Sequence, residues 1–238
     1  GGGSTAPIDA DLSSTDIFME TVFPLADSFD LNVAARYSDY SKFDSEFTYK
    51  IGGDWRVTDS VRLRSTFSTS VRTPNIRELY TTEELNFTTF VDPCDQWESN
   101  GDTSLMANCA LDVGAGFTQS ELFVEVDYPG NVNLSPEKAD TWTIGVVLEP
   151  AAVSGLAVTL DYYQIDIEDS IRNISPSAAL EQCYYSANKS HPTCADIFRD
   201  MFSGDVVFLA VPLVNAATEK MRGVDLGIRY AFQALGSD

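Results

Sequence analysis

The chain has 238 residues and a formal net charge of −21, from 15 basic and 36 acidic side chains. A surface this acidic repels phosphate backbones, which argues against a nucleic-acid partner. Hydrophobic residues make up 44% of the chain, yet no apolar run in it has the length of a membrane-spanning helix.

Alternation of apolar and polar residues predicts strands in chain order. The predicted strands lie near 15–25, 31–38, 46–57, 61–72, 141–149, 156–168 and 224–232. From Glu46 to Val57, for example, Ile51 belongs to the apolar face and Lys50 to the polar face. The alternation changes phase at Tyr162 and Tyr163, which predicts a β-bulge there.

Strand length indicates which kind of sheet these segments form. Soluble strands usually run about five or six residues, whereas these run about ten to thirteen, the length of a tilted strand that crosses a bilayer. Charged residues such as Lys50, Asp54 and Arg62 occupy the polar face. They fit a water-filled lumen, although the solvated face of a soluble sandwich would carry them as well.

The connections between the strands alternate in length. Short turns are predicted near 26–29, 57–60 and 150–155, and loops at 41–45, 72–139 and 169–217. Periplasmic turns and extracellular loops of outer-membrane barrels alternate in the same way. The aromatic residues then fall into two belts at the membrane interfaces. The inner belt holds Phe23, Trp55, Tyr230 and Phe232, and the outer belt holds Tyr37, Phe47, Tyr49, Phe67, Trp142 and Tyr162.

Several stretches resemble the barrel of TonB-dependent receptors. STSVRTPNIRELY (68–80) is similar to the family's Phe-Arg-x-Pro-x-x-x-Glu-Leu-Tyr signature, with Val71 in place of Phe. NLSPEKADTWTIGV (133–146) matches the family's Asn-Leu-x-Pro-Glu motif. ARYSDYSKF (35–43), DYYQIDIEDSI (161–171) and GVDLGIRYAF (223–232) resemble barrel strands in the family's order. The motif residues are Arg72, Pro74, Glu78, Tyr80, Asn133, Pro136 and Glu137.

We expect structural roles for these motif residues rather than ligand contact. Pro74 ends strand pairing where the chain leaves the barrel rim. Arg72 is expected to pair with Glu78 at that rim, and Pro136 with Glu137 to shape the return into the next strand.

The resemblance implies an all-β fold, a partial transmembrane antiparallel β-barrel with long extracellular loops. About seven strands of a barrel of about 22 strands are present. Residues 1–238 would be part of the barrel domain, without the plug domain and the terminal strands. A start without Met and without a visible signal peptide fits an internal fragment of a larger protein.

The implied function is uptake of a scarce nutrient, a metal chelate such as a siderophore or a glycan, through the bacterial outer membrane. Partners would be outer-membrane lipid, the nutrient, and a TonB-type energy-coupling protein that acts through the plug. No enzyme is expected, because His191 is the only histidine and no phosphate-binding loop follows a strand. The alternatives are a passive porin or outer-membrane adhesin, and a secreted calcium-binding β-protein.

The four cysteines form two local pairs, Cys94 with Cys109 and Cys183 with Cys194. Even numbers and local pairing favour disulfides in an oxidising compartment. A metal site of Cys183, His191 and Cys194 is the alternative, but it lacks a fourth soft ligand and a CxxC spacing.

Candidate ligand contacts lie in the two long loops. Trp97, Tyr128, Tyr184 and Tyr185 offer stacking surfaces for a sugar or a catecholate, and each could equally pack one loop segment on another. Residues 72–139 carry twelve carboxylates and three basic groups. This surface disfavours anionic ferric siderophores unless the plug supplies cations, and suits neutral glycans, cationic complexes or calcium-bridged ligands. No cofactor is expected apart from such calcium.

Overall fold

The computed structural model describes residues 7–120 and 123–232. They divide into two compact units, which we name the strand unit and the loop module. The strand unit comprises Leu12–Thr73, Ser135–Ser170 and the described part of Ala216–Asp238. The loop module comprises the described parts of Gly1–Asp11, Pro74–Leu134 and Ile171–Asn215.

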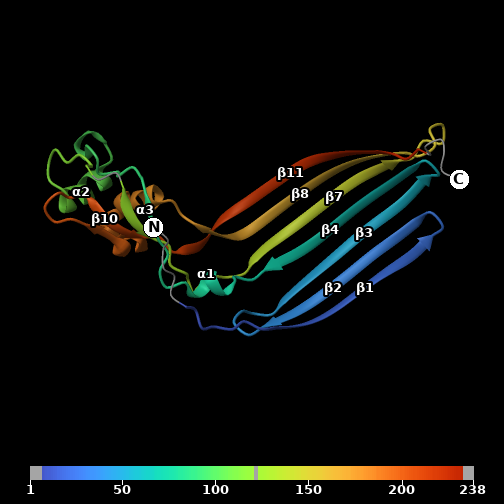
Figure 1. The fold of residues 1–238 in the computed structure, drawn as a ribbon, viewed down its shortest axis with the longest axis horizontal. Helices are drawn as coiled ribbons and strands as arrows, with labels where there is room; N and C mark the ends of the chain where they lie inside the picture. The colour runs from blue at the N-terminus through green and yellow to red at the C-terminus, as the bar shows by residue number, and fades with distance from the viewer. Residues whose placement is uncertain (1–6, 121–122, 233–238) are drawn as a thin grey trace. The chain divides into compact units, whose positions relative to one another are not determined.

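The strand unit is a seven-stranded sheet in the order β1-β2-β3-β4-β7-β8-β11 (Figure 1). Its strands are β1 Ser14–Ala26, β2 Phe29–Tyr40, β3 Glu46–Thr58, β4 Val61–Arg72, β7 Glu137–Leu148, β8 Leu156–Asn173 and β11 Leu213–Tyr230. The pairs from β1 to β8 are antiparallel. Strand lengths of 12 to 18 residues confirm the prediction of membrane-spanning length. The connections 73–136 and 174–212 are long, as predicted, but the connection 41–45 is shorter than the turn 149–155, so the predicted alternation in length holds only in part.

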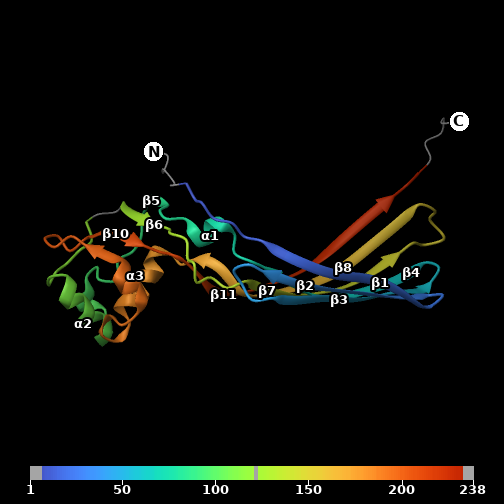
Figure 2. The ribbon, with the colours of Figure 1, turned by 90° about the horizontal axis from the view of Figure 1, so that it is seen from below.

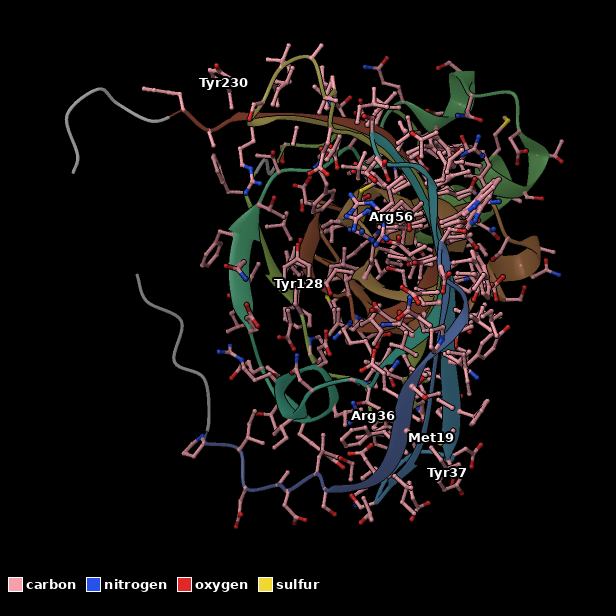
Figure 3. All side chains as sticks on the ribbon, turned by 90° about the vertical axis from the view of Figure 1, so that its right-hand side faces the viewer. Met19, Arg36, Tyr37, Arg56, Tyr128 and Tyr230 are labelled. Carbon is pink, nitrogen blue, oxygen red and sulfur yellow. A yellow bond between two sulfur atoms is a disulfide. The ribbon has the colours of Figure 1, made fainter. Side chains whose placement is uncertain are left out.

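The strand register separates a polar face from an apolar face. Ile51 lies opposite Val33 on β2 and Phe67 on β4, whereas Lys50 lies opposite Ala34 and Ser68. Because directly opposed residues share a face and successive residues alternate, Ile51 and Lys50 lie on different faces. In Figure 3, Arg36 is labelled on the polar face, and Met19 and Tyr37 on the apolar face.

The predicted bulge at Tyr162 is wrong. Tyr162 pairs with Ile144 and Tyr163 with Thr143, in a ladder that runs without a shift from Val158 to Glu168. After Tyr163, polar residues occupy the face of β8 that is apolar in the part of the strand before Tyr163. A strand that passes from lipid into water changes its pattern in this way without any backbone irregularity. The left-handed residue of β8 is Asp169, with φ 54°.

The loop module has secondary structure of its own, which the predictions for 72–139 and 169–217 did not include. A four-stranded sheet has the order β5-β6-β10-β9, formed by β5 Leu85–Thr88, β6 Val124–Asp127, β10 Val206–Ala210 and β9 Ile197–Arg199. The helices are α1 Ile76–Tyr80, α2 Thr103–Asp112 and α3 Pro176–Tyr184, with short 3-10 turns at Trp97–Ser99, Ala187–Lys189 and Pro192–Asp196. Strands β6 and β10 are parallel, and the other neighbours in this sheet are antiparallel.

A hydrophobic core lies between the small sheet and helices α2 and α3 (Figure 2). It includes Val126 and Leu209 from the sheet and Leu105 and Leu180 from the helices, all fully buried. Within the described part of the chain, no helix has the length and hydropathy of a membrane span.

Candidate functional site

Ion pairs follow the polar face of the strand unit from strand to strand. The pairs are Arg36–Asp16 at 3.0 Å, Lys50–Glu20 at 3.0 Å, Arg62–Asp54 at 3.8 Å and Arg64–Asp161 at 2.7 Å. Their side chains are partly exposed, so each pair contributes little to stability. Together they make this face hydrophilic and compensate most of its positive charge.

The opposite face exposes large apolar side chains along all seven strands. They include Ile17, Met19, Tyr37, Phe47, Ile51, Trp55, Leu63, Trp142, Ile144, Leu160, Val224, Leu226 and Ile228. Soluble monomers rarely expose a continuous apolar surface of this extent. This face therefore has the character of a surface that contacts lipid.

Aromatic residues predicted for the outer belt gather on that apolar face. Tyr37 lies opposite Phe47, and Phe67 opposite Trp142. The rings of Tyr49 and Phe67 are 5.9 Å apart between centroids. Amphipathic rings of this kind are enriched at membrane interfaces.

The signature segment 68–80 begins helix α1 through a capping box. Asn75 Oδ1 accepts the Glu78 N–H at 2.9 Å, and Glu78 Oε2 accepts the Asn75 N–H at 2.8 Å. Pro74 is fully buried before the helix. The sequence analysis did not single out Asn75, although the spacing Asn-x-x-Glu is a capping-box signal.

The other motif residues lie at strand and loop ends. Arg72, the last residue of β4, pairs with Glu137, the first residue of β7, at 2.5 Å. The Asn133 N–H donates to Asn131 Oδ1 at 2.9 Å. Tyr80 ends helix α1, and Pro136 directly precedes β7. The pairing of Arg72 with Glu78 stays a prediction.

Gly130 and Asn131 connect three segments of the loop module. The Gly130 N–H donates to the Thr81 carbonyl at 2.7 Å, and the Asn131 N–H to the Glu78 carbonyl at 2.8 Å. Asn131 Nδ2 also donates to the Leu213 carbonyl at 2.8 Å. One asparagine thus joins the end of α1 to the start of β11, and no sequence motif marked it.

A network of charged and polar groups occupies the interior of the loop module. Arg199 donates two hydrogen bonds to Asp92, at 2.6 and 2.9 Å, and one to the Tyr184 hydroxyl at 2.7 Å. The Tyr184 hydroxyl donates to Asp112, which also pairs with Lys189. Burial alone would lower the pKa of Arg199, but its bonds to Asp92 outweigh this effect and raise it. Burial raises the pKa of Tyr184.

The four predicted ligand contacts all belong to the loop module, in different settings. Tyr184 is 1% exposed, so its ring packs inside the module. Tyr185 is 44% exposed and its hydroxyl accepts a hydrogen bond from Asn100 at 3.2 Å. Trp97 and Tyr128 pack against the hydrophobic core, and burial raises the pKa of Tyr128. Ligand contact by these residues stays a prediction, and Tyr185 has the most accessible ring for it.

Both disulfides have the predicted pairing. Cys94 bonds Cys109 and Cys183 bonds Cys194, with Cα separations of 5.5 and 5.0 Å. The second bond leaves no thiolate for the alternative metal site with His191, whose ring lies 2.9 Å from Thr193 Oγ1. Within the described ranges, no group of three or more His, Cys, Asp or Glu side chains could hold a metal. Calcium in the acidic loops stays a prediction.

Solved outer-membrane receptors share this fold. The siderophore receptor PirA from Pseudomonas aeruginosa is 12% identical, with a TM-score of 0.57 over 91% of this chain and 31% of its own. PirA from Acinetobacter baumannii is 14% identical, with a TM-score of 0.57 over 93% and 26%. The ferric enterobactin receptor PfeA from Pseudomonas aeruginosa is 14% identical, with a TM-score of 0.57 over 90% and 24%. The chain thus spans 24% to 31% of the length of these proteins.

No curated protein matches the sequence. A family model described as "TonB dependent receptor-like, beta-barrel" matches residues 1–237. This description agrees with the sheet of long antiparallel strands that has one polar and one apolar face. The chain therefore belongs to the TonB-dependent receptor family, whose members are outer-membrane proteins, and forms part of the family's β-barrel.

Proposed function

We propose that this chain forms part of the barrel wall and the ligand-binding loops of a receptor for TonB-energised uptake of a scarce nutrient. The observation that carries the proposal is one sheet with a lipid-type face and an ion-paired face, joined to a folded loop module. Porins need only a wall and a constriction. A module with its own core and two disulfides is suited to hold ligand-contacting residues in fixed positions.

The proposed nutrient is a metal chelate such as a siderophore, with a glycan as the second candidate. The similar solved receptors are named for siderophores and for ferric enterobactin. The acidity of residues 72–139 works against an anionic chelate, with twelve carboxylates and three basic groups. We therefore expect a plug domain, outside this chain, to supply cationic contacts, or the chelate itself to be neutral or cationic.

The proposed energy source is a TonB-type protein that acts on that plug. Loops and plug would bind the nutrient, and the pull on the plug would release it inward. Outer-membrane lipid would cover the apolar face of the strand unit. We propose no catalytic activity, such as acyl transfer or phosphoryl transfer, for this chain.

Uptake by cells that carry the intact receptor tests the proposal. Cells with and without the receptor gene are supplied with radioactive ferric enterobactin, with a neutral ferric chelate, and with a labelled oligosaccharide. We expect cells to accumulate one of these compounds only when they carry the receptor gene. This accumulation should stop when a proton uncoupler is added. Accumulation that continues at the same rate with the uncoupler would identify a passive porin. Receptor-dependent binding to cells without any accumulation would identify an adhesin.

A further inference from the structure

The outer face of the small sheet carries a row of aromatic residues. Phe87 on β5 lies opposite Glu125 on β6, Glu125 opposite Phe208 on β10, and Phe208 opposite Phe198 on β9. The row therefore crosses all four strands on one face. Phe87 is 70% and Phe198 is 53% exposed, and the rings of Phe198 and Phe208 are 5.7 Å apart.

The other face of the same strands is covered. Val124, Val126 and Leu209 are buried there in the core that contains both disulfides. The small sheet thus has one face packed inside the module and one face on which Phe87 and Phe198 are exposed. Exposed phenylalanine is depleted on ordinary protein surfaces and enriched where partners bind.

Glu125 gives this aromatic row a charge. It is half-buried between Phe87 and Phe208, and its side chain makes no hydrogen bond or ion pair with another described residue. The Asp92 carboxylate in the same module, by contrast, has Arg199 as its partner. A carboxylate flanked by aromatic rings is a suitable site for an ammonium or guanidinium group, which gains from both the charge and the ring faces.

We infer that this face is a docking site for a basic, apolar peptide segment of another protein. Charge excludes a second copy of this acidic chain as the partner, since the formal charge is −21. An extended peptide is favoured because β5 is an edge strand of the small sheet. A peptide strand that pairs with that edge places every second side chain on the face of Phe87, within reach of Glu125. The inference goes beyond nutrient uptake and does not depend on it.

Peptide binding to the intact receptor in detergent tests the inference. The probe is a fluorescent, end-blocked peptide of about eight residues in which lysine and phenylalanine alternate, and the readout is fluorescence anisotropy. The unchanged receptor is expected to bind it saturably. Glu125→Gln removes the charge without changing the shape of the side chain, and should weaken binding by about tenfold. Phe87→Ala should weaken it by about fivefold.

Two matched variants separate the site from general attraction by an acidic module. Glu83→Gln removes an exposed carboxylate outside the sheet, and Leu111→Ala removes an exposed apolar side chain of α2. Both should bind the peptide as the unchanged receptor does. A peptide with glutamate in place of lysine should not bind. No binding by the unchanged receptor, unaltered binding by Glu125→Gln, or equal weakening by Glu83→Gln would each overturn the inference.

Discussion

Arg199 connects Asp92 and Tyr184, two buried polar side chains of the loop module. The side chains of Arg199 and Asp92 are 8% and 0% exposed, and the arginine also bonds the Tyr184 hydroxyl. Because a buried charge that loses its partner cannot be solvated, removal of one member costs far more than the pair itself contributes.

The variant Arg199→Met should therefore destabilise the loop module by about 3–5 kcal/mol. The temperature at which trypsin first cleaves the module in the folded receptor would report this loss. Arg77→Met is the matched control, since Arg77 pairs with Glu84 at 4.0 Å with both side chains largely exposed. Its effect should stay below about 1 kcal/mol. Equal effects of the two variants would show that the buried network is not what stabilises the module.

For single residues, the sequence shows which side chains can form a disulfide or contact a ligand, but not whether each side chain is buried or exposed. Cys94 and Cys109 were paired correctly because proximity in sequence limits the choices. Tyr184 and Tyr185 are neighbours with the same side chain, yet one is buried and the other is exposed. Which of them points inward depends on the contacts of α3 with Asp112 and Arg199. No pattern within the sequence of α3 contains that information.

Among the secondary-structure elements, helix α1 is held in place by a close backbone approach. A Cβ atom at Gly130 would lie 2.8 Å from the Leu79 carbonyl carbon and from the Thr81 nitrogen. Backbone atoms cannot move aside as a flexible side chain does. The Gly130→Ala variant should therefore separate α1 from the segment that precedes β7.

We expect Gly130→Ala to destabilise the loop module by about 1–3 kcal/mol, measured as the same onset of tryptic cleavage. Gly114→Ala is the control, because a Cβ atom at Gly114 has nothing within 4 Å. It should be neutral or slightly stabilising. If the two alanine variants were equally stable, the close approach at Gly130 would not matter for the fold.

The strands offer a second test at this scale. Ile51→Lys places a charge on the lipid-type face of β3 and should cost about 2–4 kcal/mol near the middle of the membrane. Lys50→Ala removes only the partly exposed pair with Glu20, and should cost less than about 1 kcal/mol. Urea unfolding from lipid vesicles measures both. A costly Lys50→Ala together with a mild Ile51→Lys would reverse the assignment of the two faces.

The elements differ in how well the sequence predicts them. Strands of 12 or more residues repeat their alternation often enough to be recognised, and β4 begins and ends where predicted. The strands of the small sheet have three to five residues, too few for a period to stand out. β11 begins at Leu213, whereas the alternation predicts its start near 224. The start of β7 at Glu137 was missed as well, because outside the membrane both faces of a strand can be polar. β8 lost its pattern for the same reason.

The whole chain divides into two units, the strand unit and the loop module. Long paired strands form the seven-stranded sheet, and the two long insertions fold together through Asn131 and through their shared core. The order of the sequence motifs made the family recognisable. It did not reveal the aromatic row of the small sheet, because Phe87, Glu125 and Phe198 come together only through the strand pairing of the module.

In the membrane wall that we propose, one face of the seven-stranded sheet lies in lipid and the other in water. Spin labels placed in turn at positions 47 to 56 of β3, in the intact receptor in lipid vesicles, test it most directly. Oxygen concentrates in lipid and a polar nickel complex in water. We expect collisions with oxygen to peak at positions 47, 49, 51, 53 and 55, and collisions with the nickel complex to peak at the positions between them. Accessibility without a period of two, or with the two probes exchanged, would contradict it.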